Sequence, residues 1–126
     1  MTLADLRKIG EALNIITTEI LLNPYWKYCG LLSEKEVIEF LEARENCSLQ
    51  LLKKVAYYVL TYAENTALVV FYFNDFDRNY FEWIKPLLEK LRELFKEVQN
   101  TNDSKVAFRK VMDMIWECLN YGIDPL

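Results

Sequence analysis

Hydrophobic residues recur at helical spacing along most of this chain. The first stripe consists of Leu3, Leu6, Ile9, Leu13, Ile16 and Ile20, which follow one another every three or four positions. Thr2 with Asp5 three residues later is a variant of the capping box. The pair Asn23–Pro24 ends the pattern, because the residue before a proline avoids the α region. The pattern predicts an amphipathic helix that begins at Thr2 and ends at Asn23.

Two further helices are expected over residues 33–45 and 48–64. Ser33 and Glu36 form a capping box for the first, whose inner face is predicted to carry Val37, Phe40 and Leu41. Ser48 is placed to cap the second. Its apolar stripe is broad and is expected to lie deep in the core: Leu51, Leu52, Val55, Ala56, Val59, Tyr62 and Ala63. Asn65 interrupts this stripe.

The segment 66–73, "TALVVFYF", is open between strand and helix. Its β-branched and aromatic residues favour a strand. A short apolar run of this kind also extends a helix, since such runs do not determine their own type. A lone strand needs a partner, which would be the segment 25–30, "YWKYCG", or a second copy of the chain.

Two helices are predicted in the C-terminal half. Asp77 is the best N-cap for the first, whose seam is spaced as in a heptad repeat: Tyr80, Ile84, Leu87, Leu91, Leu94 and Val98. Pro86 either kinks this helix near Glu82 or marks its true beginning. Asp103 or Ser104 caps the second, and Gly122 follows its end. The inner face of this last helix is predicted to carry Val106, Phe108, Val111, Met112, Ile115, Cys118 and Leu119.

These elements predict one domain, 1–126, that is mainly α: a compact bundle of four to five helices, with a short β segment at 66–73 if that run is a strand. The 126 residues are 52% hydrophobic and 27% charged, the composition of an ordinary globular domain. The start, "MTLADLRKIG", has no apolar signal region, and Glu64 interrupts the longest apolar run. We therefore expect no membrane span and a cytoplasmic location.

Histidine is absent, and this limits the chemistry that the chain can perform. Catalytic triads built on histidine and histidine-bearing zinc sites are excluded. Cys29, Cys47 and Cys118 lie far apart without CxxC spacing, so we expect free thiols, with one disulfide as the open alternative. The net charge of −4 lowers the expectation of nucleic-acid binding. No cofactor or metal is expected.

An unusual aromatic run extends from Phe71 to Trp83, where seven of thirteen residues are aromatic. Residues 68–73, which lead into this run, are apolar on every side whether they form a strand or a helix. They therefore have to be covered on every side. A small domain covers one face easily, so we expect either a core role or a contact with a second copy or a protein partner. The predicted partner or dimer contacts are Phe71, Tyr72, Phe73, Phe76, Tyr80 and Trp83.

Two other functions remain open at this level. The order of helices followed by "ALVVFYFND" resembles a winged helix-turn-helix, in which Gln50, Lys53, Lys54 and Tyr57 would contact DNA. Asp75 and Asp77 form a D-x-D pair that suits a hard cation such as magnesium, the only basis for an enzymatic function. Their alternative role is a turn and a helix cap.

The chain also resembles two groups of known proteins. Abundant Leu, Ile, Tyr, Glu and Lys, two glutamines and no histidine resemble the small orphan proteins of viruses of hyperthermophilic archaea. That likeness implies a helical or winged-helix fold and a dimer. The segments "LLKKVAYYVLTYAEN" (51–65) and "DSKVAFRKVMDMIWECLNYG" (103–122) are similar to parts of the helical small subunits of type III CRISPR effector complexes, which implies RNA contact.

From these observations we predict a non-catalytic protein-interaction or assembly protein that forms a homodimer. The first likeness implies that it is viral, and a viral protein would be located in the host cytoplasm. A winged-helix DNA-binding regulator is the second hypothesis, and a small helical subunit of an RNA-guided complex is another. An enzyme that uses Asp75 and Asp77 with a metal is the least favoured.

Overall fold

The computed structural model describes residues 32–126, which form four α-helices and one short 3-10 helix. The helices are α3 (Glu34–Ala43), α4 (Leu49–Phe73), α5 (Arg78–Asn100) and α6 (Ser104–Asn120), with η2 (Arg44–Asn46) between α3 and α4. The described part of the chain contains no strand, so the helical bundle predicted from the sequence is confirmed. The helix predicted from Thr2 to Asn23, the segment 25–30 and Cys29 lie outside the described residues.

The predicted caps are present and explain where each helix begins. Ser33 and Glu36 form the reciprocal capping box at the start of α3, with both hydrogen bonds at 3.1 Å. The Ser48 hydroxyl accepts from the Leu51 amide at 3.1 Å at the start of α4. Asp103, rather than Ser104, caps α6 by accepting from the Lys105 amide at 2.9 Å. At the C-terminal end of α6, Gly122 has a φ of 74°, as a glycine after a helix commonly has.

Residues 66–73 belong to α4, so the strand interpretation is wrong. Asn65 does not end the helix, because it lies on the exposed side where a polar side chain costs little. The buried stripe continues beyond it through Ala67, Leu68 and Phe71, at the three- and four-residue spacing of a helix. The helix therefore runs unbroken for 25 residues.

The long helix α5 begins well before its proline. The Asp77 carboxylate accepts from the Asn79 amide at 2.9 Å, which confirms Asp77 as the N-cap. Pro86 lies inside α5 and its side chain is exposed. The heptad-like seam is buried from Ile84 to Val98, while Tyr80 at its N-terminal end is half-buried.

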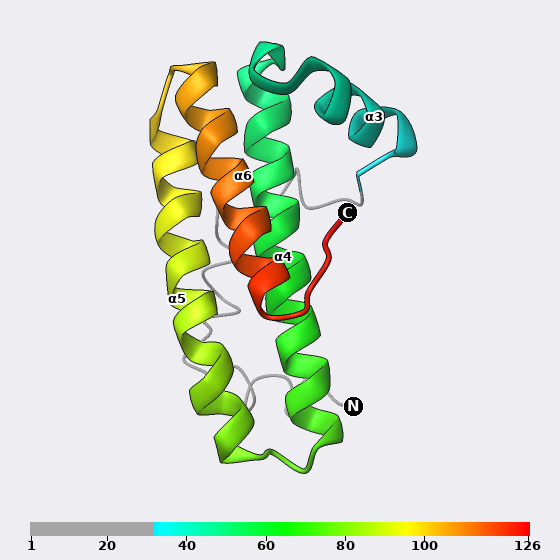
Figure 1. Cartoon of the computed structure of the whole chain (residues 1–126), viewed down its shortest axis with the longest axis vertical. Helices are drawn as coiled ribbons and strands as arrows, with labels where there is room; N and C mark the ends of the chain where they lie inside the picture. Colours follow the sequence, from blue (N-terminus) through cyan, green and yellow to red (C-terminus); the bar gives the residue numbers. More distant parts are fainter. Residues whose placement is uncertain (1–31) are drawn as a thin grey trace.

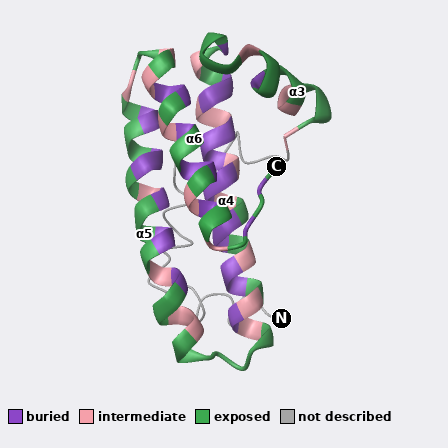
Figure 2. Cartoon of the chain, in the orientation of Figure 1, coloured by how far each residue is buried: buried purple, intermediate pink, exposed green. Residues whose placement is uncertain are grey.

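Helix α6 packs against both α4 and α5, and α3 crosses the end of the bundle near the start of α4 (Figure 1). Each long helix turns one buried stripe inward and leaves its other side exposed (Figure 2). Residues with essentially no exposed surface from all three helices form the centre of the core: Val55, Ala56, Val59, Leu91, Val98, Val111 and Met114.

Several apolar residues predicted to face inward are exposed. Met112 and Leu119 on α6 are 38% and 44% exposed, and Met114 occupies the core position instead. Leu41 on α3 is 57% exposed and Tyr62 on α4 is 38% exposed. In each case the residue lies at the edge of a broad apolar stripe, and the neighbouring helices cover only the middle of that stripe.

The bundle is uneven in length. Helix α6 has 17 residues, whereas α4 and α5 have 25 and 23. At a rise of about 1.5 Å per residue, α6 is about 12 Å shorter than α4. The turn that joins α4 to α5 therefore lies beyond the C-terminal end of α6 (Figure 1).

Candidate interaction surface

The predicted contact residues gather into two aromatic clusters near the turn between α4 and α5. In the first, which we call the tip cluster, Phe71, Tyr72, Phe73, Phe76 and Phe81 are linked through ring contacts. The ring of Phe76 lies 5.4 Å from that of Phe71 and 5.9 Å from that of Tyr72. Tyr72 also contacts Phe73 at 5.3 Å, and Phe71 contacts Phe81 at 6.2 Å.

The members of the tip cluster differ in exposure. Phe73 and Phe76 are 74% and 50% exposed, and Tyr72 is half-buried. Phe71 is only 4% exposed, so its assignment as a partner contact is wrong: it packs between α4 and α5 and supports the exposed rings. The surface available to a partner thus consists chiefly of Phe73 and Phe76.

The second cluster, which we call the Trp83 cluster, lies at the end of α6 and contains Tyr80, Trp83 and Tyr121. Trp83 is 53% exposed and lies between the other two, at 6.0 Å from Tyr80 and 4.9 Å from Tyr121. Partial burial raises the pKa of Tyr80. The contact with Tyr121 joins α5 to the residue that follows α6.

The turn between the clusters contains the D-x-D pair. Asp77 is used as the cap of α5, and Asp75 is exposed. Asp75 and Phe76 both adopt positive φ angles, 53° and 59°, which is uncommon for residues other than glycine. Among residues 32–126 no group of three or more acidic or cysteine side chains is arranged to hold a metal ion.

The residues proposed to contact DNA all lie on α4 and differ in exposure. Tyr57 is 1% exposed and packs edge-on against Phe95 at 5.8 Å, so its assignment as a DNA contact is wrong. The Lys54 ammonium lies 2.7 Å from the Glu36 carboxylate. Lys53 is half-buried, and Gln50 is exposed. The segment expected to form the wing is part of α4.

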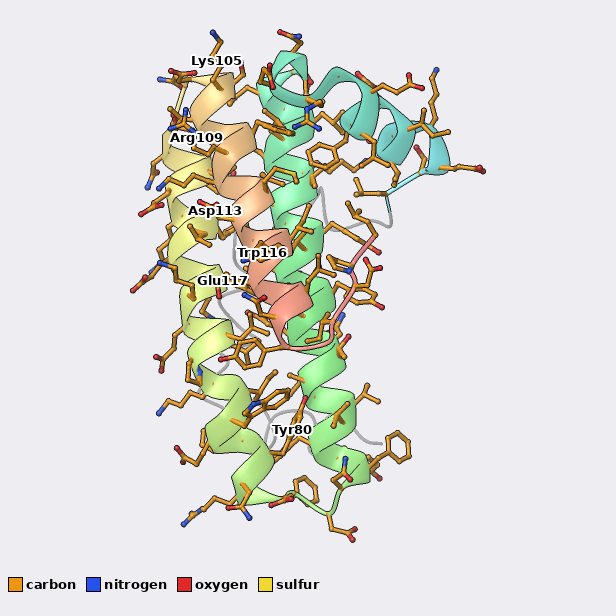
Figure 3. All side chains as sticks on the ribbon, in the orientation of Figure 1. Tyr80, Lys105, Arg109, Asp113, Trp116 and Glu117 are labelled. Carbon is orange, nitrogen blue, oxygen red and sulfur yellow. The ribbon has the colours of Figure 1, made fainter. Side chains whose placement is uncertain are left out.

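An exposed surface on α6 was missed at the sequence level. Met112, Trp116 and Leu119 follow one another at four and three residues and are 38%, 63% and 44% exposed. Charged residues accompany them along the same side: Lys105, Arg109, Asp113 and, half-exposed at the edge, Glu117 (Figure 3). We call these seven residues the α6 outer face. Trp116 was the available signal, because a tryptophan outside the predicted inner stripe has to lie on another face.

The two described cysteines are buried free thiols, as expected. Burial raises the pKa of the Cys118 thiol to about 12, and the nearby Glu117 carboxylate adds to this effect. Burial also raises the pKa of Cys47, whose Sγ donates weakly to the carbonyl oxygens of Glu39 and Phe40. Both thiols are therefore protonated and poorly reactive in the folded protein.

Comparisons with known proteins returned no match: no protein family, curated protein or solved structure is significantly similar to this chain. No helix between residues 32 and 126 combines the length and apolar character needed to cross a membrane.

Proposed function

We propose that this chain is a non-catalytic assembly protein that acts as a homodimer, and that the tip cluster and the Trp83 cluster supply contacts between copies. The observation that carries the proposal is the exposure of Phe73, Phe76 and Trp83, each at least half exposed, within one region of a small domain. The absence of histidine from the whole sequence agrees with a non-catalytic role.

Burial of these rings is the physical reason for association. Aromatic side chains contribute strongly to contact energies because each buries a large apolar area. Contiguous apolar patches on monomeric proteins are normally small, and larger ones are used for binding. In the tip cluster the rings contact one another, so they present one patch rather than scattered side chains.

The backbone at the tip supports the same proposal. Phe76 has a φ of 59°, a conformation that costs a residue with a side chain roughly 1 to 2 kcal/mol. Its ring remains 50% exposed, so burial within the described protein recovers only part of that cost. A partner that covers the ring would recover more.

The test is the molecular mass in solution, measured by sedimentation equilibrium over a range of concentrations. The wild-type chain is expected to sediment as a dimer at micromolar concentration. A double variant, Phe73→Ser with Phe76→Ser, is expected to sediment as a monomer while keeping its helical circular dichroism. Leu41→Ser is the matched control, because Leu41 is similarly exposed but lies on α3 at the opposite end of the bundle (Figure 1).

A wild-type chain that stays monomeric up to about 100 µM would overturn the proposal, since a dimer that dissociates at such concentrations is weak. If the double variant still forms the dimer with unchanged affinity, the protein self-associates but does not do so through the tip cluster.

A further inference from the structure

Helix α3 buries far less of itself than the other helices of the described chain. Of its ten residues, Phe40 alone is buried. Val37 is half-buried, and Ile38 and Leu41 are 48% and 57% exposed. Each of the three long helices buries at least six residues. Because burial of an apolar face is what mainly holds a helix in a protein, α3 is the most weakly attached of the four.

The anchor of α3 is the ring of Phe40, which is 1% exposed. It lies 5.7 Å from the ring of Phe108 on α6. The Sγ atom of the buried Cys47 lies 3.9 Å from the carbonyl oxygen of Phe40. Phe108 is 9% exposed, so withdrawal of the Phe40 ring would uncover an aromatic side chain of α6.

The polar link between α3 and α4 is the ion pair of Glu36 with Lys54. The Lys54 ammonium lies 2.7 Å from the Glu36 carboxylate, and the two side chains are 27% and 25% exposed. An ion pair that water reaches in this way contributes little to stability. It orients α3 on α4, but Phe40 remains the main attachment.

The residue that joins α3 to η2 has a strained backbone. Arg44 has a φ of 52° and a ψ of −123°, a conformation that suits glycine and is costly for a residue with a side chain. Its amide donates to the carbonyl of Phe40, and its carbonyl accepts from the amide of Cys47 at 3.0 Å. Its guanidinium lies 5.4 Å from the centre of the Phe108 ring. The strain is relieved when α3 leaves its place.

The two sides of Arg44 differ in how they are held. On one side η2 packs against α6. On the other side α3 has only ten residues, and a helix shorter than about 12 residues is barely stable in water when it is isolated. Once Phe40 has left its site, α3 should therefore unfold and gain conformational entropy. The boundary between the part that opens and the part that stays is Arg44.

We propose that α3 is a strap that opens and closes as one unit about Arg44, while α4, α5 and α6 stay folded. In the closed state the strap covers Phe108, and in the open state this ring is uncovered. The fold thus contains an apolar surface that is presented only on opening. The inference does not depend on the proposed function, because α3 lies at the opposite end of the bundle from the tip cluster (Figure 1).

Hydrogen exchange of the native full-length chain, followed by NMR at single amides, tests the proposal. The protection factor is the exchange rate of an amide in an unfolded chain divided by its rate in the protein. The amides from Val37 to Arg44 belong to α3 and its C-cap. They are expected to share similar protection factors, at least about 100-fold below those of the most protected amides of α4, α5 and α6. Equal protection of α3 and the long helices would overturn the proposal.

Two substitutions of Arg44 test the hinge. Both Arg44→Gly and Arg44→Ala remove the guanidinium, so they differ only in their backbone preference. Within a helix glycine is less stable than alanine, but at this φ the order should be reversed. Protection of the α3 amides is expected to be about fivefold or more higher in Arg44→Gly than in Arg44→Ala.

Ala43→Gly is the matched control for the hinge. Ala43 lies one residue earlier and has an ordinary helical φ of −76°. Its replacement by glycine should lower the protection of the α3 amides. Protection in Arg44→Ala that equals or exceeds that in Arg44→Gly would overturn the assignment of Arg44 as a strained hinge.

Removal of the anchor tests whether α3 opens as a separate unit. In Phe40→Ala the α3 amides should lose their protection, while circular dichroism should show that the long helices remain. Protection of the amides in α4, α5 and α6 can fall only by the factor that protects α3 in the wild type. Beyond that factor the strap is already open, and the substitution has nothing further to weaken.

Leu41→Ala is the control for the anchor, because Leu41 is 57% exposed on the same helix, and it should leave protection of the long helices unchanged. A loss of protection in the long helices of Phe40→Ala that exceeds the wild-type factor of α3 would show that α3 is an integral part of the core. That result, or unfolding of the whole chain in this variant, would overturn the proposal.

Discussion

Arg92 on α5 donates a hydrogen bond from Nε to Oε1 of Glu64 on α4 across 3.3 Å, where Glu64 is 1% exposed. Glu64 is the single charged residue between Val55 and Phe73. A carboxylate buried at this depth is costly unless it is paired. The pair therefore fixes the position of α4 along α5.

Removal of the arginine is expected to destabilise the fold. Arg92→Leu leaves a buried carboxylate without this guanidinium, and the free energy of unfolding should fall by about 3 kcal/mol. The double variant Glu64→Leu with Arg92→Leu should recover much of that loss, because the buried Glu64 carboxylate is then removed together with this guanidinium. Urea unfolding measures the free energy of unfolding of both variants. Lys90→Leu, at an exposed position of α5, is the control. A loss below about 0.5 kcal/mol in Arg92→Leu, the range of ordinary surface changes, would contradict this account.

Replacement of the proline in α5 is expected to stabilise the protein. Pro86 has no amide hydrogen for the carbonyl of Glu82, and its ring crowds the preceding turn. Its side chain is exposed, so Pro86→Ala loses little packing. We expect the free energy of unfolding to rise by about 1 to 3 kcal/mol. Thermal unfolding tests this, and Glu89→Ala at an exposed site of the same helix should change little.

The contact between α3 and α4 is expected to weaken in acid. The hydrogen bond from Lys54 is the main cause that lowers the pKa of Glu36 below its usual 4.5. A lowered folded-state pKa stabilises the fold above pH 4.5, and that contribution is lost as the pH falls through the folded-state value. Lys54→Met should cost up to about 1 kcal/mol at neutral pH, since the pair is partly exposed.

The same variant should differ progressively less from wild type as the pH falls below 4.5, when Glu36 becomes protonated in both. Urea unfolding at several pH values measures the difference. Lys35→Met, at an exposed position of α3, serves as control. A cost that does not depend on pH would mean that Lys54 acts through packing alone.

The buried thiols are expected to resist alkylation. In a Cys29→Ser variant, Cys47 and Cys118 should remain unlabelled by a maleimide at mildly alkaline pH, because both are buried and their pKa values are raised. Denaturant should expose both to labelling, which mass spectrometry counts. Rapid labelling of the native protein at Cys118 would show that the C-terminal end of α6 opens frequently.

The helices and their beginnings were predictable because the responsible interactions are local. Ser33, Ser48 and Asp77 bond to amides within three residues, and such caps are visible in sequence. The seam of α5 was also predictable, since its apolar residues occupy a narrow stripe that only one orientation buries. The continuation of α4 through residue 73 was not, because the apolar run has the residue types of a strand and its helical form depends on packing against α5.

The candidate surfaces were predicted less well, for a related reason. The aromatic run indicated a region but not the side of each ring, so Phe71 was assigned to the surface and lies in the core. On α6 the apolar positions cover more than half of the circumference. Which edge of this apolar surface is buried depends on where α4 and α5 lie. Met112 and Leu119 were therefore assigned to the buried face, whereas both are exposed.

The connections between the helices are short: α4 is joined to α5 by residues 74–77, and α5 to α6 by residues 101–103. Neighbouring helices can therefore meet soon after they form, without closing a long loop. Helical domains with such sequence-local contacts reach their native state within about microseconds to milliseconds. If the active species is a dimer, the rate at which it forms after synthesis is then limited by how often two folded chains collide. The concentration of the chain in the cell would therefore determine that rate.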